Sequence, residues 1–549
     1  MAAETAALTG RHPAMYARFP GLAPTRLVAG RAMRGALIWG GVFALVVWEL
    51  VNEFGSEYPT AAARALLVQS VGADVGMQAI FGAAHHLDTL AGYTAYHAIG
   101  VLGIIGAVWG LLAGTRLLRG EEDSGRWELV LAGQTSRRRA AVGAMAGLGL
   151  ALLTLWAVTA AAFFAFGQGP GARFSIVSSM FAAAATVAGA AMFLAIGALC
   201  SQLAGTRRQA TGIAAAILGI AFVIRLVAYS DTSLQWLHWV SPLGWVDELR
   251  PLTDSRPLLL MPIVGTIAAL VAVAIFLAGR RDTGASILRA KDTAAPQTRR
   301  LNGPLGLAYR LDRGSALGWI AGFAIGGVVL GMTAKTSEDV WANQQGGVLA
   351  NLGGAAGGAA YLGVVFLVFA IVVAIAAAGQ VAATRDEESE GYLDHLLARS
   401  VARLPWLAGR FALSSALLVA AGAVIGLLTW VGAAAAGASL ALPTMLAAGL
   451  NVVPAGIFVL GIGTLVHGLA PRFASPVAYG LVAWSLLVEI IGASLGASPW
   501  LLDLSVFHWV ARAPAVAVQW NSAALLIAGG VAAAAIGAQA FARRDLKGA

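Results

Sequence analysis

Charged residues are unusually scarce in this sequence. Only 11% of the 549 residues are Asp, Glu, Lys or Arg, whereas 59% are hydrophobic and the mean hydropathy is +0.77. A soluble domain carries about a quarter charged residues, so few such domains could bury this much apolar surface. Apolar runs of about 20 residues, the length that crosses a bilayer core, recur along the whole chain. The composition therefore excludes an ordinary soluble protein and predicts one embedded in lipid.

Cysteine and metal-binding patterns are nearly absent. The single cysteine, Cys200, excludes an internal disulfide and a zinc site built on cysteine, and we interpret it as a small apolar residue of a membrane span. The adjacent histidines of "HHLD" (85–88) would point to different faces of a helix, which disfavours a metal site there. We expect this chain to bind no metal and no cofactor of its own.

A nucleotide-binding loop and an enzyme-like group of side chains are also missing. A loop that cradles phosphate needs the pattern G-x-x-x-x-G-K-[ST], and the nearest stretch, "LGMTAKTS" around Lys335, lacks the glycine before the lysine. No paired carboxylates or Ser/His set can be recognised, so an enzyme or a scaffold is the least favoured class. The net charge of +9 does not indicate a nucleic-acid partner, because the basic residues are dispersed among loops.

The apolar runs divide into twelve expected membrane spans. No segment alternates like the strands of a barrel, and a backbone in lipid must satisfy its own hydrogen bonds, so we expect helices and an all-α multi-pass membrane protein. The first six spans lie near residues 31–51, 92–115, 141–166, 175–201, 210–229 and 258–279. The second six lie near residues 315–334, 359–383, 407–434, 442–468, 475–494 and 522–541.

Lysine and arginine indicate the orientation. An even number of spans places both termini on one side, and 29 of the 36 lysines and arginines fall on that side. Cytoplasmic loops attract positive charge, so we expect both termini to be cytoplasmic. Two Trp-rich stretches on the opposite side, 234–245 and 499–510, are too short to span the bilayer and predict short helices beneath the outer surface.

The sequence contains an internal repeat. Two charged segments, "RLLRGEEDSGRWELVLAGQTSRRR" (116–139) and "ATRDEESEGYLDHLLARSVAR" (383–403), align without a gap, and the triplet "RRD" recurs at 280–282 and 543–545. We therefore expect a tandem duplication of two parallel six-helix repeats, related by an axis along the membrane normal. The expected parts are a cytoplasmic amphipathic arm (1–30), a first half (31–282), a cytoplasmic linker (283–312) and a second half (313–549).

Each charged segment predicts a short amphipathic cytoplasmic helix between two spans. Acidic residues come first, as a helix N-terminus favours, and an apolar stripe follows at i, i+3, i+4 spacing. The stripes are Trp127, Val130 and Leu131, and Leu393, Leu396 and Leu397. Two interpretations stay open: a helix on the inner leaflet, and a plug for a groove on a cytoplasmic partner. The duplication favours the partner, because two equivalent plugs suit a symmetric dimer.

The pattern R-x-E-E-x-x-G that closes the second span, followed by "ELVLAGQTSR", resembles the type-2 permeases of ATP-binding-cassette exporters. The chain is similar in particular to the fused, twelve-span actinobacterial kind associated with polyketide and multidrug efflux. The resemblance implies a permease of the bacterial cell membrane that exports bulky apolar compounds. It also implies a separate ATPase, expected as a homodimer that binds ATP and Mg²⁺, docked on coupling helices near 119–137 and 385–403.

The coupling role, carried over by resemblance, falls on eleven residues: Arg119, Glu121, Glu122, Gly125, Arg126, Glu128, Arg385, Glu387, Glu388, Gly391 and Asp394. The second copy departs from the pattern. Tyr392 stands where the first copy has Arg126, and His395 and Arg399 interrupt the stripe. Unequal coupling at the two sites is therefore a further expectation.

Two charges fall within expected spans at equivalent positions of the repeat, Arg225 in the fifth and Glu489 in the eleventh. A lone charge in lipid costs several kcal/mol, about 3 or more at the centre, so it needs a partner or water. We hypothesise an outer gate in which Arg225 pairs with Glu489, with snorkelling of each towards the headgroups as the alternative.

Gly106, Gly110 and Gly114 form consecutive G-x-x-x-G steps in the second span, which favour close helix packing or a seam between the halves.

The rival function is an ion-coupled secondary transporter of parallel-repeat type. Such a transporter usually needs titratable groups near mid-membrane, where Glu489 is almost alone.

Overall fold

The computed structural model describes residues 23–71, 78, 81–133, 135–168, 173–230, 232–282, 286–287, 303–332, 334, 358–389, 391–398, 401–495 and 499–545. The chain divides into two compact units, Met1–Thr293 and Ala294–Ala549, each of which is described by itself. This boundary falls inside the expected linker (283–312). Most of that linker, and residues 1–22 of the expected N-terminal arm, lie outside the described residues.

The first unit is built from long helices joined by short ones. Its long helices are α1 (Ala23–Glu57), α4 (Leu90–His97) continuing through a π turn (Ala98–Leu102) into α5 (Gly103–Leu117), α8 (Arg137–Phe166), α9 (Ile176–Leu203), α10 (Arg207–Ser230) and α12 (Leu260–Arg280). The short helices are α2 (Ala61–Val71), α6 (Arg119–Asp123), α7 (Arg126–Leu131), α11 (Pro242–Asp247) and two 3₁₀ turns, Thr232–Trp239 and Pro257–Leu259.

The second unit follows the same order of helices. Its long helices are α13 (Pro304–Met332), α15 (Gly358–Ser389), α17 (Arg403–Ala435), α18 (Leu442–Asn451) leading into α19 (Val453–Leu469), α20 (Pro471–Leu495) and α22 (Trp520–Arg543). The short helices are α16 (Tyr392–Leu397), α21 (Pro499–Leu502) and a 3₁₀ turn (Phe507–Trp509). The short helices expected in both Trp-rich stretches are therefore present.

Eleven helices of the described residues are long and apolar enough to cross a membrane. The expected span near 475–494 is occupied by α20, a helix of 25 residues that is not among the eleven. Helices α1 and α13 begin earlier than expected, so part of the predicted arm and linker is helical. Because α1 has 35 residues and each rises about 1.5 Å, it is longer than the roughly 30 Å core of a bilayer. The chain is thus a helical multi-pass membrane protein, as its composition predicts.

Glycine allows the closest helix contacts, at different places in the two units. In the first, α5 packs on α9, and a Cβ at Gly110 would lie 2.1 Å from the carbonyl oxygen of Ala190. In the second, α19 packs on α22, and a Cβ at Gly468 would lie 2.0 Å from the carbonyl oxygen of Gly537. The G-x-x-x-G steps of the second span therefore serve packing within their own half.

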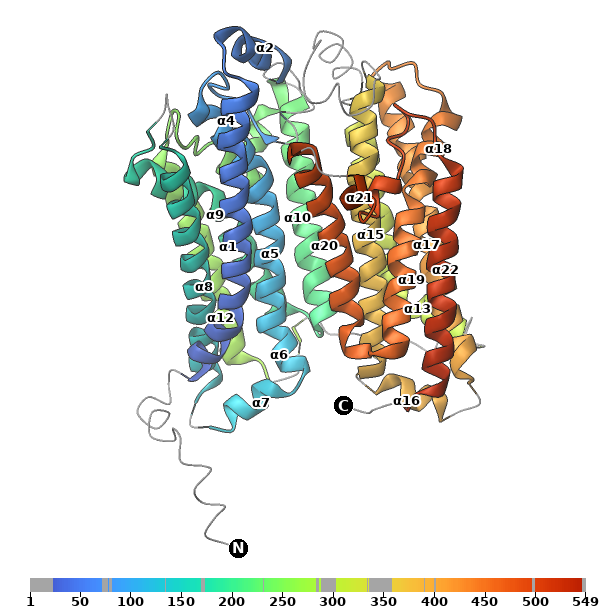
Figure 1. The fold of residues 1–549 in the computed structure, drawn as a ribbon. Helices are drawn as coiled ribbons and strands as arrows, with labels where there is room; N and C mark the ends of the chain where they lie inside the picture. Colours follow the sequence, from blue (N-terminus) through green and yellow to red (C-terminus); the bar gives the residue numbers. More distant parts are fainter. Residues whose placement is uncertain are drawn as a thin grey trace, which may run out of the picture. The chain divides into compact units, whose positions relative to one another are not determined.

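Aliphatic and aromatic side chains fill the interior of each unit. The first is centred on α1, α8 and α9, with Phe43, Leu148 and Phe193 fully enclosed, and the second on α15, α17 and α19, with Phe366 and Leu418 enclosed. Helices α6 and α7 lie at the end of the first unit opposite α2, and α16 lies where α22 ends (Figure 1). These two ends carry the charged segments.

Candidate functional site

A left-handed glycine gives both charged segments the same turn. Gly125 has φ +71° and precedes α7, and the aligned Gly391 has φ +77° and precedes α16. A side chain at such φ values costs about 1 kcal/mol, which explains a glycine at this place in both copies. After the turn, the chain runs as a short helix before the next long helix begins.

The predicted amphipathic character of α7 and α16 is present in the structure. In α7 the stripe residues Trp127 and Leu131 are partly buried, whereas the side chain of Leu129 is 77% exposed and Glu128 is exposed. In α16, Leu393 is fully buried. The outward residues of α16 are Tyr392, Asp394 and His395. Each helix thus holds its bundle with one face and presents an acidic residue, Glu128 or Asp394, on the other.

The first charged segment is held by arginines that enclose its acidic residues. The Oε atoms of Glu121 accept hydrogen bonds from Arg126 at 2.8 and 3.1 Å, and Glu121 also pairs with Arg31 of α1. Arg119 is 1% exposed, pairs with Glu122 at 3.3 Å and with Asp123 at 3.1 Å, and donates to the carbonyl oxygen of Gly205. The acidic cluster is therefore an internal brace rather than a free surface.

The second segment is braced differently. Glu387, aligned with Glu121, lies 3.3 Å from the guanidinium of Arg410 of α17, which also pairs with Asp312 of α13. Arg410 is buried, and the repeat places Ala144 at this position in the first half. Arg385, aligned with the buried Arg119, is partly exposed and lies 3.9 Å from Asp386. The first of the two aligned glutamates, Glu121 or Glu387, thus takes a different partner in each half.

The second of the two aligned glutamates, Glu122 or Glu388, has an equivalent arginine partner in both halves. Glu122 accepts a hydrogen bond from Arg281 at 2.8 Å, and Glu388 accepts one from Arg544 at 2.6 Å. Arg281 and Arg544 are the middle residues of the two "RRD" triplets, directly after α12 and α22. The backbone carbonyl of each arginine also accepts a hydrogen bond from the first residue of the long helix that follows the charged segment. These donors are Arg137 of α8, at 3.0 Å from Arg281, and Arg403 of α17, at 2.7 Å from Arg544.

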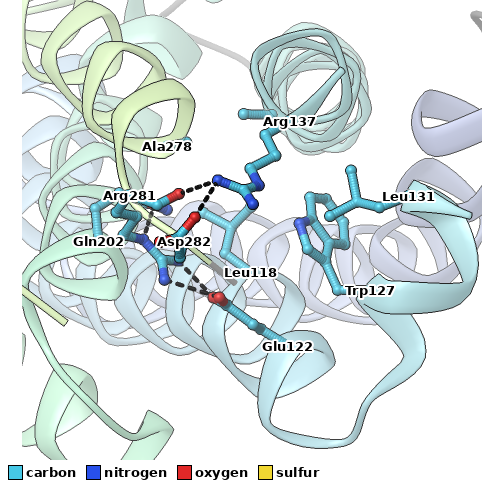
Figure 2. A pocket seen from close by; sticks show the side chains of 10 residues that line it. Leu118, Glu122, Trp127, Leu131, Arg137, Gln202, Ala278, Arg281 and Asp282 are labelled. Carbon is cyan, nitrogen blue, oxygen red and sulfur yellow. Dashed lines mark hydrogen bonds and ion pairs between the residues drawn. The ribbon is translucent and has the colours of Figure 1, made fainter. Parts of the chain in front are cut away.

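Figure 2 shows this arrangement in the first half. Arg281 lies between Glu122 and Arg137, and its Nε donates to the side-chain oxygen of Gln202 of α9 at 2.9 Å. Trp127 and Leu131 of α7 line the same small pocket. In the second half the aligned residue of α19 is His467, whose Nε2 lies 3.2 Å from Glu388. In the sequence, the charged segment and the "RRD" triplet are two separate repeated motifs. In the structure, a glutamate of the segment binds the middle arginine of the triplet in both halves.

The chain is similar to known proteins over most of its length. The family described as "Multidrug efflux system permease Rv1217c, C-terminal domain" matches residues 28–278 and 301–542. The chain belongs to this multidrug efflux permease family. A relative, the multidrug efflux system permease protein Rv1217c of Mycobacterium tuberculosis (strain ATCC 25618 / H37Rv), is 30% identical over 506 residues, covering 89% of this chain and 88% of the relative. The predicted resemblance to multidrug efflux permeases is confirmed.

Membership of a permease family agrees with a chain that moves compounds rather than one that carries out catalysis. Apart from Gly125 and Gly391, which form the turns, the predicted coupling residues differ in burial. Arg119, Glu121 and Glu122 are buried and hold the first segment in place, while Arg126 and Glu128 are exposed. In the second half, Glu388 is nearly buried, Arg385 and Glu387 are partly so, and Asp394 is exposed. Contact with a partner stays a prediction for all of them.

The two charges predicted to form an outer gate have partners nearby. Arg225 is 1% exposed and binds Asp247 of α11 through two hydrogen bonds of 2.7 and 3.0 Å. Glu489 accepts a hydrogen bond from Ser505 at 3.2 Å and lies 3.7 Å from Arg512. Both halves thus pair the fifth helix with the loop that follows, with the charges reversed. The Arg225–Glu489 pair stays a prediction. Because each charge has a partner within its own half, the free-energy cost of an unpaired charge in lipid is no longer a reason to expect that pair.

Proposed function

We propose that the protein is the membrane permease of an ATP-driven exporter for bulky apolar compounds, and that α7 and α16 receive movement from a separate ATPase. The observation that carries the proposal is the pair of equivalent short helices, each anchored to its bundle and each with an outward acidic residue. The proposal includes twelve spans in two parallel repeats with both termini in the cytoplasm. The distribution of lysine and arginine supports that orientation.

The outward faces of α7 and α16 suit a protein partner better than lipid alone. Glu128 and Asp394 are acidic, and anionic headgroups on the inner leaflet would repel them. The exposed residues of each helix include an apolar or aromatic side chain and a carboxylate, Leu129 and Glu128 in α7 and Tyr392 and Asp394 in α16. Such a helix can place its apolar side chain in a hydrophobic groove of a partner and its carboxylate near a basic residue there. Two such helices fit the two equal grooves of an ATPase homodimer, which would bind ATP and Mg²⁺.

The proposed cycle uses the helices as rigid connections. Closure of the ATPase dimer around ATP would move α7 and α16, and through the braces described above would tilt the bundle to which each belongs. Access to an apolar path would then change. The multidrug efflux family and the few charges within the spans support the proposed substrate class. The alternative is an ion-coupled transporter, which would need no ATPase.

Purification of the full chain from its native membrane tests the proposal. We expect an ATP-hydrolysing subunit to co-purify in two copies, and Glu128→Gln together with Asp394→Asn to weaken its retention. Efflux of an apolar fluorescent dye should stop on ATP depletion and continue with a protonophore at constant ATP. Dye efflux that needs the proton gradient, from a permease that retains no ATPase, would establish the ion-coupled alternative instead.

A further inference from the structure

The end of each bundle contains one ion pair that the duplication has kept. Glu122 and Glu388 belong to the charged segments, and Arg281 and Arg544 follow the last long helix of their halves. The neighbouring contacts differ between the halves: Glu121 binds Arg126 and Arg31, whereas the aligned Glu387 lies against Arg410. Of the two glutamates that align between the segments, the second, Glu122 or Glu388, therefore keeps an equivalent arginine partner.

Both pairs are largely withdrawn from solvent. The side chains of Glu122 and Arg281 are 5% and 11% exposed, and those of Glu388 and Arg544 are 9% and 17% exposed. Salt and water weaken such a pair far less than a surface pair. The carbonyl bonds from Arg137 and Arg403 add a second connection at the same point. Three elements therefore meet at each arginine: the charged segment, the start of the next long helix and the end of the last one.

We propose that Glu122–Arg281 and Glu388–Arg544 are the joints that make the last helix of each half, α12 or α22, move with its coupling helix. The proposal rests on the proposed function, because it concerns how movement from the ATPase reaches the bundle. The four side chains are positioning residues and touch no substrate. Without a joint, the charged segment moves with α7 or α16 while the last helix of that half stays still. ATP is then hydrolysed without matching transport.

Joint variants distinguish this role from a merely structural one. The permease and its ATPase are reconstituted in liposomes, and dye transported per ATP hydrolysed is measured for Glu122→Gln, Arg281→Gln and the double variant. We expect each single variant to lower this ratio about 5-fold or more, with the ATPase still bound and active, as for a lost coupling between two sites. The double variant should be no worse than either single variant. Glu388→Gln and Arg544→Gln should behave in the same way.

The matched control is Glu248→Gln. Glu248 pairs with Arg256 at 2.7 Å, outside the charged segments, so the charge change is identical but no joint is touched. A wild-type ratio in the single joint variants, or a double variant whose loss is the product of the two single losses, overturns the proposal. If the ATPase binds and drives wild-type transport in the same experiment, the proposed function stands even though the joint fails. Wild-type transport without any ATPase overturns both.

A covalent bridge covers the case in which the glutamine variants do not accumulate. Cys200 is the only cysteine and is replaced by alanine, after which Glu122→Cys and Arg281→Cys are introduced together. A short bifunctional thiol reagent then links the two positions. We expect the unlinked variant to hydrolyse ATP with little transport and the linked variant to regain transport. Transport that stays low after linking, or that was normal before it, contradicts the joint.

Discussion

Truncation of Leu129 separates binding of a partner from stability of the fold. The side chain is 77% exposed in α7, so Leu129→Ala removes almost no packing inside the permease. The change removes about three carbon groups worth about 0.8 kcal/mol each when a partner covers them, or roughly 2.4 kcal/mol in all. Scaled by the exposed 77%, the expected loss is about 1.8 kcal/mol, which weakens the binding of the ATPase about 20-fold.

The assay is a binding isotherm of the purified ATPase on the permease held in nanodiscs, beside a thermal unfolding curve of the same preparation. Leu258→Ala is the matched control, because Leu258 is 76% exposed, belongs to the same half and lies outside both charged segments. We expect Leu129→Ala to change affinity without changing the unfolding temperature, and Leu258→Ala to change neither. Equal affinity in both variants would refute the role of α7. A lowered unfolding temperature for Leu129→Ala would instead show that the residue serves the fold.

Three further predictions test the remaining structure. Gly125→Ala and Gly391→Ala force a side chain into left-handed backbone at about 1 kcal/mol each, so both should lower dye efflux, whereas Gly212→Ala, on α10 with open space around it, should not. Arg225→Gln leaves the buried Asp247 without its arginine partner, with only the Tyr229 hydroxyl donating to it, and should cost about 3 kcal/mol in an unfolding assay. The double variant with Asp247→Asn should recover part of that loss, and no recovery would argue against the pair. Gly110→Ala should lower the unfolding temperature because its Cβ would overlap the Ala190 carbonyl, while Gly103→Ala on the same helix should not; equal effects would contradict the packing of α5 on α9.

Local patterns made several parts of this structure predictable. The positions of Trp127 and Leu131 at helical spacing indicated which face of α7 packs inward, and the alignment of Gly125 with Gly391 marked a shared turn. Both features depend on a few neighbouring residues, so a single sequence contains enough information. The internal repeat added a second copy of each pattern, which separates a recurring requirement from chance.

Other parts depend on residues far apart in the chain. Arg225 was expected to meet the pseudo-equivalent Glu489, but its carboxylate partner, Asp247, lies at the end of a short helix outside the spans. Arg281 and Glu122 are separated by 159 positions, and no local period connects them. The exchange of Ala144 for Arg410 redirects Glu387, although the two charged segments align without a gap. Pairings of this kind follow from helix packing, which the sequence pattern does not specify.

Site-specific photocrosslinking in intact cells tests most directly whether α7 and α16 bind an ATPase. A benzophenone side chain is placed at Leu129, at His395 and, for comparison, at Leu258, all of which are exposed. We expect positions 129 and 395 each to capture the same ATP-hydrolysing subunit, identified by mass spectrometry, and position 258 not to capture it. Capture of lipid alone at 129 and 395, or equal capture of the subunit at 258, would contradict the docking of an ATPase on α7 and α16.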